Sequence, residues 1–242
     1  MTNLKRVEIC FSPNLYTLYQ KEFDFECVVV IDVLRATTAM ITGLNEGVNA
    51  FIPVASLEEA IFFQERGYIV AAERNAKQIE GFPLGNSPLS YFNGRFRGKK
   101  IVITTTNGTQ AIEIAKQDHK EVILAAFSNL TAVSEALIQR NQNILVLCAG
   151  WKNKFNLEDT ICAGGVVQQL LQSKQYFSTE DSSISAKYLF ISAKDNYKKI
   201  LKDSSHRTRL QNLGLQEDIK YCLTLDTCQI VPILVNGEII KL

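Results

Sequence analysis

The sequence has few of the residues that build disulfide frameworks and histidine-rich metal centres. Its 242 residues include six cysteines, which form no CxxC pair, and only two histidines. Scattered cysteines in apolar surroundings such as ILVLCAG are typical of reduced, buried thiols. We therefore expect neither a disulfide framework nor a histidine-rich zinc or iron site.

An excess of one charge and a long apolar run are also missing. The chain carries 26 basic and 25 acidic residues, so no global field attracts nucleic acid or an anionic membrane. No apolar run approaches the length of a membrane span, and the initial MTNLKRVEICFSPN lacks the apolar segment of a signal peptide. We expect a cytoplasmic protein with neither nucleic acid nor membrane as a partner.

Several common motifs of nucleotide binding and nucleophilic catalysis are absent. The lack of GxGxxG after a strand and of GxxxxGK[ST] disfavours dinucleotide and P-loop binding, and the lack of GxSxG argues against an α/β-hydrolase. Asp32 follows an apolar run as in aspartate-nucleophile phosphatases, but Leu34 stands where their second acid would be. A phospho-aspartate mechanism stays open without being favoured.

Short runs of Val, Ile and Leu alternate with amphipathic stretches, which predicts an α/β fold. Runs of this length suit strands buried on both faces of a largely parallel sheet, with helices covering each side. The predicted strands cover 27–31, 50–54, 68–72, 99–104, 122–126, 144–149 and 188–193. The predicted helices include 37–46, 56–66, 108–117, 129–140 and 159–173. We expect a layered α/β/α architecture with a mixed, mostly parallel sheet.

The C-terminal end departs from this alternation. Asn236 and Gly237 stand between two apolar runs, the strongest short-range signal for a β-hairpin, so we expect an antiparallel C-terminal hairpin and at least one antiparallel sheet edge. The whole chain, 1–242, is predicted to be a single domain. If it consists of two closely packed lobes, their boundary lies near 172–188, a polar segment typical of a mobile surface connection.

Acids and arginines follow two of the predicted strands, where open α/β sheets bind ligands. Asp32 and Arg35 follow one strand, and Glu73 and Arg74 follow another. A carboxylate at such a position is costly unless it binds a cation or a hydrogen-bond network, and arginine suits phosphate or sulfonate oxygens. An internal Asp32–Arg35 pair is the alternative. Glu73 could be a metal ligand or a general base, and Arg74 a second anion clamp.

Hydroxyl and amide side chains follow other strands. In TTTNGT, a strand end is followed by the expected start of a helix near Gly108. Backbone N–H groups at a helix N-terminus, with neighbouring hydroxyls, make an anion site, although the same residues are ordinary helix caps. The candidate substrate-binding residues are Asn86, Ser87, Thr105, Thr106, Asn107, Gly108, Ser128 and Asn129.

An oxygen-rich site with few histidines suits Mg²⁺, which takes one or two carboxylates and completes its shell with waters and phosphate oxygens. Asp32, Glu158 and Asp159 are the candidate metal ligands, although the last two also suit the start of a helix by complementing its dipole. His206, in SSHRTRL, could face an anion, whereas His119, in a polar stretch, is predicted to be a surface residue.

Several of these segments occur together in one order: DVLRATT, AERN with GFPLGNSP, TTTNGT, SNLTAV, CAG and LEDTICAG, followed by SSHRTRLQNLGLQEDIKYCLTLDTCQIVP. From about Val28 to Val235, the chain thereby resembles the 2-phosphosulfolactate phosphatase family. The resemblance implies Mg²⁺-dependent hydrolysis of (R)-2-phospho-3-sulfolactate to 3-sulfolactate and phosphate, a step that leads toward coenzyme M in methanogens. The family's motif residues correspond here to Asp32, Arg35, Glu73, Arg74, Asn86, Thr105, Asn107, Glu158 and Asp159.

For this substrate, we interpret Asp32 and one of Glu158 and Asp159 as Mg²⁺ ligands, the arginines as clamps on the developing charge, and Glu73 as the base that orients water. The expected partner is a small anionic phosphate ester, and a homo-oligomer is compatible with the sequence.

Two alternatives stay open. Arg207 follows His206 where the resemblance leads us to expect a small residue, so the pocket could serve a phosphatase of another small phosphorylated hydroxy acid. The chain could also be a non-catalytic module that binds phosphate esters.

Overall fold

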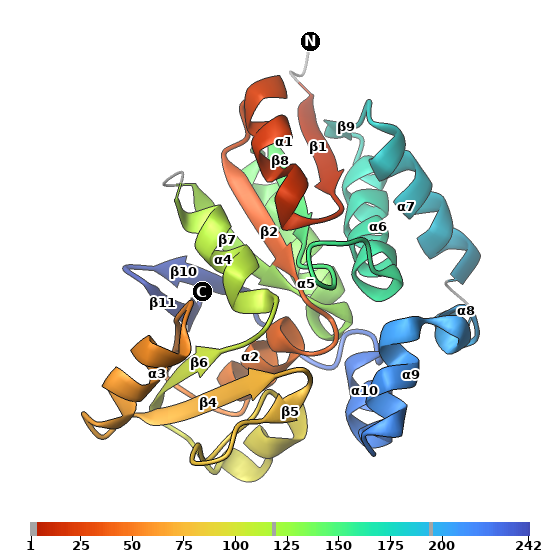
Figure 1. The fold of residues 1–242 in the computed structure, drawn as a ribbon. Helices are drawn as coiled ribbons and strands as arrows, with labels where there is room; N and C mark the ends of the chain where they lie inside the picture. The colour runs from red at the N-terminus through yellow and green to blue at the C-terminus, as the bar shows by residue number, and fades with distance from the viewer. Residues whose placement is uncertain (1–3, 118–119, 194–195) are drawn as a thin grey trace.

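The computed structural model describes residues 4–117, 120–193 and 196–242 (Figure 1). The strands are β1 Lys5–Cys10, β2 Cys27–Ile31, β3 Ala50–Pro53, β4 Ile69–Arg74, β5 Lys77–Gln78, β6 Lys100–Thr104, β7 Glu121–Ala125, β8 Ile144–Cys148, β9 Tyr176–Phe177, β10 Pro232–Val235 and β11 Glu238–Lys241. Within the described residues they form one eleven-stranded sheet, in the order β5-β4-β6-β3-β11-β10-β7-β2-β8-β1-β9. The expectation of a single domain, or of two closely packed lobes, stays a prediction.

The sheet consists of two parallel halves joined by the C-terminal hairpin. β7, β2, β8, β1 and β9 pair in parallel, as do β3, β6 and β4. β10 and β11 lie between the halves and run antiparallel to each other, to β7 and to β3. The predicted α/β fold with a mostly parallel sheet and an antiparallel C-terminal hairpin is therefore confirmed. The hairpin lies inside the sheet, and the antiparallel edge comes from β5, which pairs with β4.

The strand direction reverses between the two halves, because three successive antiparallel pairings separate them. The sheet nevertheless twists so that the C-terminal ends of β2, β4 and β6 all point toward the middle of the molecule (Figure 1). This arrangement brings together loops from strands that are not neighbours.

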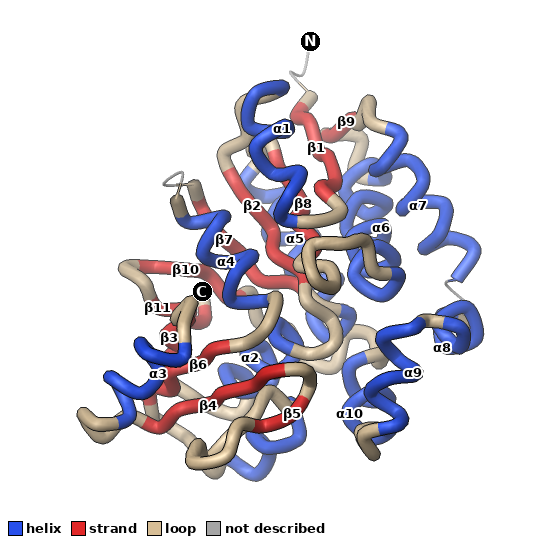
Figure 2. Tube along the Cα trace, viewed as in Figure 1, coloured by secondary structure: helices blue, strands red, loops and turns tan. Residues whose placement is uncertain are grey.

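The helices cover both faces of the sheet (Figure 2). They are α1 Tyr16–Glu22, α2 Ala36–Asn45, α3 Leu57–Gln64, α4 Gly108–Lys116, α5 Leu130–Arg140, α6 Leu157–Gln172, α7 Asp181–Ala193, α8 Tyr197–Ile200, α9 Ser205–Asn212 and α10 Gln216–Cys222, with 3₁₀ turns at Pro13–Leu15, Pro88–Gly94, Phe127–Asn129 and Leu201–Asp203. In β2, Val29 and Ile31 join the core under α5, α6 and α7, whereas Val28 and Val30 join the core under α2 and α4. The run is continuously apolar because both faces are buried.

The five predicted helices are present, with ends shifted by at most two residues. α3 begins with the capping box expected from its sequence. The Ser56 hydroxyl accepts from the Glu59 N–H at 3.1 Å, and the Glu59 carboxylate accepts from the Ser56 N–H at 3.1 Å. These two hydrogen bonds satisfy N–H groups that the helix itself leaves free.

The predicted strand at 188–193 is wrong, because this segment is the second half of α7. The buried residues of α7 are Ser183, Ala186, Phe190 and Ala193, a spacing of three and four that belongs to a helix. The run YLFISA has the apolar content of a strand, but only the residues before it reveal the helical period.

The segment 172–188 is also not the mobile connection that its polar composition predicts. It contains the end of α6, all of β9 and the first half of α7. The buried Glu8 carboxylate of β1 accepts hydrogen bonds from the hydroxyls of Ser178 at 2.6 Å and Ser183 at 2.7 Å and from the Thr179 N–H at 2.8 Å. The polar residues of this segment therefore surround one buried acid.

The six cysteines are all buried and free, as their apolar surroundings predict. Among the described residues, no helix combines the length and apolar character needed to cross a membrane. His119 lies outside the described residues, so its predicted surface position stays a prediction.

Candidate active site

A small cavity, which we call the site cavity, lies where the ends of β2, β4 and β6 meet α9. Its volume is about 10 Å³, which is close to the minimum for one water molecule. Its lining residues are Asp32, Leu34, Arg35, Glu73, Ala76, Asn86, Asn107, Trp151, His206 and Arg209. Three predicted strand ends thus meet here through Asp32, Glu73 and Asn107.

Asp32 is the acid at the end of β2, and its side chain is largely unpaired. One carboxylate oxygen accepts a long hydrogen bond of 3.4 Å from the Ala36 N–H. Burial raises the pKa of Asp32 from 3.8 to about 6, and the carboxylates of Glu73 and Glu158 add to this, whereas His206 and the Ala36 N–H oppose it. The ionised form is therefore destabilised and suited to bind a cation.

Gly108 allows this acid to lie against the start of α4. An ideal Cβ at Gly108 would lie 2.5 Å from the Ala36 Cβ and 2.7 Å from the Asp32 Oδ2. Gly108, a candidate substrate-binding residue in the sequence, therefore leaves room for the side chain of Asp32.

Glu73 is held by residues of its own neighbourhood. Its carboxylate accepts from the Thr106 N–H at 3.1 Å, from the Thr106 hydroxyl at 3.1 Å and from the Ala76 N–H. Glu73 is buried at the cavity wall. These hydrogen bonds occupy both carboxylate oxygens of Glu73. The role of Glu73 as a general base stays a prediction.

The two arginines predicted to clamp the substrate have protein partners. Arg35 lines the site cavity, but its guanidinium forms a buried ion pair with Asp218 and donates to the Ala76 carbonyl at 2.7 Å. Arg74 donates to the Glu73 carbonyl at 2.7 Å and to the Thr104 hydroxyl at 3.0 Å, and it is not among the lining residues. The alternative of an Asp32–Arg35 pair is not observed, because the partner of Arg35 is Asp218.

His206 and Glu158 form a buried pair on the other side of the cavity. The His206 Nδ1 lies 2.6 Å from the Glu158 Oε1, and the Ser204 hydroxyl donates to the other oxygen at 3.2 Å. The His206 ring stacks on Trp151, with 5.2 Å between ring centroids. A carboxylate on Nδ1 fixes the ring and its tautomer, so Nε2 remains for a ligand. Glu158 acts through His206 and does not itself line the cavity.

Arg209 lies one helical turn after His206 and also lines the cavity. Its Cζ lies 3.4 Å from the centre of the Trp151 ring. Nε and one terminal nitrogen are buried without a hydrogen-bond acceptor, and burial lowers the pKa of Arg209, against the attraction of Glu73 and Glu158. Buried N–H groups without acceptors are rare in native structures, and an anionic ligand in the site cavity would supply the missing acceptors.

Asp159 lies behind Asp32 and is fully engaged by the protein. It accepts from the N–H groups of Val33 at 2.8 Å and Gly150 at 3.1 Å and from the Asn156 amide at 2.8 Å. Burial raises the pKa of Asp159 well above its ordinary value, and the neighbouring Asp32 raises it further. Asp159 thus joins the loops after β2 and β8.

The predicted substrate-binding residues divide into two groups. Asn86 and Asn107 line the site cavity, Thr106 holds Glu73, and the Ser87 hydroxyl donates to Asp218 at 2.7 Å. Other members are structural in the described contacts: Thr105 and Thr109 exchange backbone and hydroxyl hydrogen bonds at the start of α4. Ser128 and Asn129 are fully buried and lie outside the cavity lining, where the Asn129 amide donates to the Leu124 and Ile230 carbonyls.

The residues present fit a Mg²⁺ ion held mainly by one carboxylate. Within the residues that the structure describes, no group of three or more His, Cys, Asp or Glu side chains is arranged to bind a metal. Mg²⁺ usually needs only one or two carboxylates, with waters and phosphate oxygens as its other ligands. Asp32 offers free oxygen lone pairs at the cavity, and the buried Asn86 Oδ1 has no hydrogen-bond partner. Glu158 and Asp159, by contrast, are occupied by protein donors.

Comparison with known proteins shows the family of the chain. The family model described as 2-phosphosulpholactate phosphatase matches residues 11–237. The chain belongs to this family. Proteins named probable 2-phosphosulfolactate phosphatase from Thermotoga petrophila and Thermotoga maritima are each 44% identical to it over 217 residues, or 89% of this chain and 92% of theirs. One of the same name from Caldanaerobacter subterraneus is 41% identical over 215 residues, or 87% of this chain and 88% of its own.

Sequence reasoning missed Trp151, Arg209 and Asp218, and left His206 without a role. The residues predicted from the sequence follow strands, whereas His206, Arg209 and Asp218 belong to α9 and α10. A usable signal was the spacing of three between His206 and Arg209, which places both on one face of a helix.

Proposed function

We propose that the protein is a Mg²⁺-dependent phosphatase that hydrolyses 2-phospho-3-sulfolactate to 3-sulfolactate and phosphate. The observation that carries the proposal is Arg209, whose buried N–H groups lack acceptors beside Asp32 and His206. A phosphate group bound beside Arg209 would supply those acceptors, and it would have to widen the site cavity, whose volume of about 10 Å³ fits one water molecule. Membership of the phosphatase family and the names of its relatives support the same reaction.

Each residue has a role that follows from its surroundings. Arg209, whose guanidinium lies over the Trp151 ring, donates hydrogen bonds to the phosphoryl oxygens as negative charge on them changes. His206, oriented by Glu158 at Nδ1 and protonated at both ring nitrogens, gives its Nε2 proton to the ester oxygen as the bond between that oxygen and phosphorus breaks. A water molecule forms the new bond to phosphorus, and its proton passes to the buried Glu73 carboxylate at the cavity wall. Asp32 would hold Mg²⁺, which when bound supplies positive charge against the phosphoryl oxygens.

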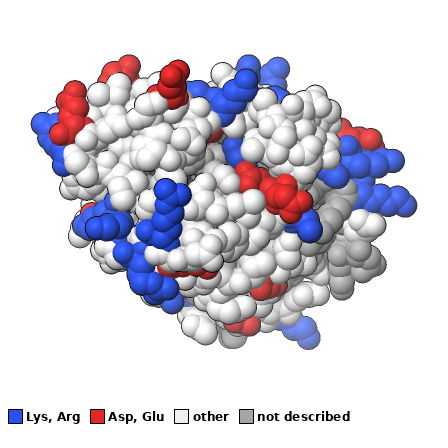
Figure 3. Space-filling view, turned by 90° about the horizontal axis from the view of Figure 1, so that it is seen from below, with Lys and Arg blue, Asp and Glu red and all other residues white. Residues whose placement is uncertain are grey.

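On the face drawn in Figure 3, acidic and basic side chains are interspersed and neither sign covers the surface. The attraction for a phosphate ester therefore rests on individual buried groups, since the chain's net charge is only +1.

The test is phosphate release from racemic 2-phosphosulfolactate, 2-phospholactate and phosphoglycolate, each with Mg²⁺ and with a chelator. We expect Mg²⁺-dependent release that favours the sulfonated ester. Release from the other esters alone would keep the phosphatase and replace its substrate, and binding without release from any ester would favour a non-catalytic module.

Arg209→Gln tests the residue that carries the proposal. We expect kcat/KM to fall by roughly 10²-fold, as for the loss of one donor to a developing oxyanion. Arg207→Gln is the matched control, because Arg207 is on the same helix but does not line the site cavity. Equal effects of the two substitutions would contradict the role of Arg209.

A further inference from the structure

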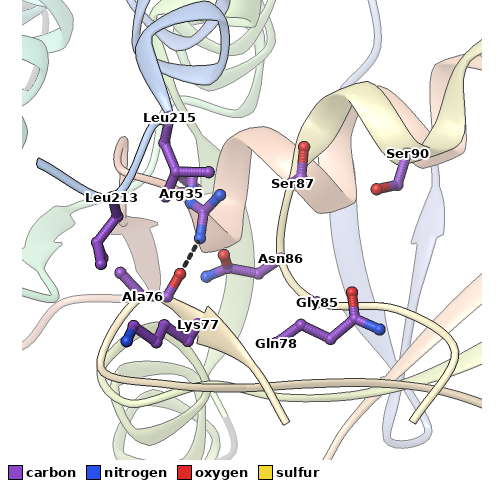
Figure 4. A pocket seen from close by; sticks show the side chains of 10 residues that line it. All are labelled: Arg35, Ala76, Lys77, Gln78, Gly85, Asn86, Ser87, Ser90, Leu213 and Leu215. Atoms are coloured by element: carbon purple, nitrogen blue, oxygen red, sulfur yellow. Dashed lines mark hydrogen bonds between the residues drawn. The ribbon is translucent and has the colours of Figure 1, made fainter. Parts of the chain in front are cut away.

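A second, larger cavity adjoins the site cavity. Its volume is about 250 Å³, and it shares Arg35, Ala76 and Asn86 with the site cavity. The residues that line it are Arg35, Ala76, Lys77, Gln78, Gly85, Asn86, Ser87, Ser90, Leu213 and Leu215 (Figure 4). The site cavity, at about 10 Å³, has room for about one water molecule, so a bound ester has to use the larger space as well.

The lining of this second cavity suits an anion. Hydrogen-bond donors for a ligand come from the amine of Lys77, the amide of Asn86 and the hydroxyl of Ser90, and none of the lining residues is acidic. The Ser87 hydroxyl already donates to Asp218, and the Gln78 amide donates to the Phe82 carbonyl. Figure 4 shows Leu213 and Leu215 on one side and Ser87 and Ser90 on the other.

Lys77 is the cation of this lining that is available to a ligand. The charge of Arg35 is already balanced by the buried Asp218, and its other nitrogen donates to the Ala76 carbonyl (Figure 4). Lys77 is exposed and forms no ion pair in the described part of the chain. A lysine amine on a flexible stem can adjust to a ligand oxygen at little cost.

Asn86 lies where the two cavities meet. Its Oδ1 is buried and has no hydrogen-bond partner, and the residue is only 5% exposed. The amide N–H groups of Asn86 can donate to an anionic ligand, whereas the unpartnered Oδ1 is an acceptor and is left for the Mg²⁺ ion.

We propose that the second cavity binds the sulfonate and carboxylate end of the substrate, with Lys77 and Asn86 as its recognition residues. This inference rests on the proposed function, because it assigns the phosphate to the site cavity. It makes the second cavity the part of the site that distinguishes a sulfonated ester from a shorter or uncharged one.

Binding of the product separates this inference from turnover. We would titrate wild type and Lys77→Gln with 3-sulfolactate and, separately, with inorganic phosphate, by calorimetry. We expect Lys77→Gln to weaken 3-sulfolactate binding roughly three- to tenfold, the size of one hydrogen bond to a charged group at a partly exposed position, and to leave phosphate binding unchanged. Lys77→Arg should retain most of the affinity, and Lys99→Gln, an exposed lysine outside both cavities, should retain all of it.

Kinetics give a second readout. For 2-phosphosulfolactate, Lys77→Gln should raise KM with little change in kcat, and its preference over 2-phospholactate, which lacks the sulfonate, should shrink by the same factor. Unchanged 3-sulfolactate affinity in Lys77→Gln, or an equal loss for phosphate, would overturn the inference. If wild type hydrolyses no ester but binds 3-sulfolactate in a Lys77-dependent manner, the hydrolysis is refuted and the binding site stands.

Discussion

Replacing Asp32 with asparagine should stabilise the protein while abolishing its activity. Asp32 is 7% exposed and its carboxylate accepts only one long hydrogen bond, from the Ala36 N–H. Burial raises its pKa from 3.8 to about 6, so the folded state prefers the protonated acid more than the unfolded state does. An uncharged amide of almost the same shape removes this cost and keeps an oxygen for the Ala36 N–H.

The size of the expected stabilisation follows from the pKa shift of Asp32. About two pKa units correspond to roughly 3 kcal/mol, since one unit is about 1.4 kcal/mol. Because the folded pKa of Asp32 is the higher one, the ionised acid destabilises the fold fully above pH 6, and this cost disappears as the pH falls from about 6 to about 4. For a chain of this length, roughly 3 kcal/mol corresponds to a rise in Tm of roughly 5 to 10 °C.

The assay is thermal unfolding of wild type and Asp32→Asn at pH 7.5 and at pH 4, in chelator so that no metal stabilises wild type. We expect the variant to be more stable at pH 7.5 and equal to wild type at pH 4. The control is Asp203→Asn, because the Asp203 side chain is 82% exposed and should have little effect at either pH. A variant that is less stable than wild type at pH 7.5 would refute the reasoning.

Two further predictions concern other buried acids and their partners. His206→Gln should lower kcat by roughly 10²-fold or more and remove one limb of the pH–rate profile, because His206 is the proposed acid that Glu158 orients. Steady-state kinetics over a range of pH measure both effects, and an unchanged profile would exclude His206 as the acid. Glu8→Gln should lower the free energy of unfolding at neutral pH by roughly 2 kcal/mol or more, measured in urea. Desolvation raises the pKa of Glu8, but hydrogen bonds led by that of Ser178 lower it overall, so this stabilisation is present above pH 4.5 and is lost as the pH falls; a deficit that grows in acid would contradict this.

Much of the fold could be predicted because local patterns agree with the final packing. The runs that become β2 and β8 are continuously apolar, and the structure buries both of their faces. The capping box of α3 and the turn at Asn236 and Gly237 depend only on neighbouring residues, so no tertiary contact overrides them.

The errors come from the two places where tertiary context decides. YLFISA is apolar enough for a strand, but α6 packs against it so closely that a Cβ at Gly165 would lie 2.8 Å from the Phe190 ring. The polar segment before it has no core-forming pattern of its own, and its order depends on Glu8, which is about 170 residues earlier in the chain. A distant buried carboxylate cannot be inferred from the local composition of the segment that covers it.

The site was predictable only where strand ends supply it. Asp32, Glu73 and Asn107 follow the rule that ligands bind beyond the carboxyl ends of strands, and all three line the site cavity. Arg35 shows the limit of this reasoning, because its partner Asp218 comes from α10 and neutralises the charge that the sequence assigned to the substrate.

The arrangement of the sheet explains why these residues need a helix from elsewhere to complete the site. The two parallel halves bring their strand ends together from opposite directions, and the acids that follow them, Asp32 and Glu73, place negative charge at the meeting point. Burial is the main cause of the raised pKa of Asp32, and the carboxylates of Glu73 and Glu158 add to it. A phosphate ester would be repelled there unless cations were added. Arg209 of α9 supplies one such charge beside His206. A substitution that destabilises α9 should therefore weaken phosphate binding even when every residue at the strand ends is unchanged.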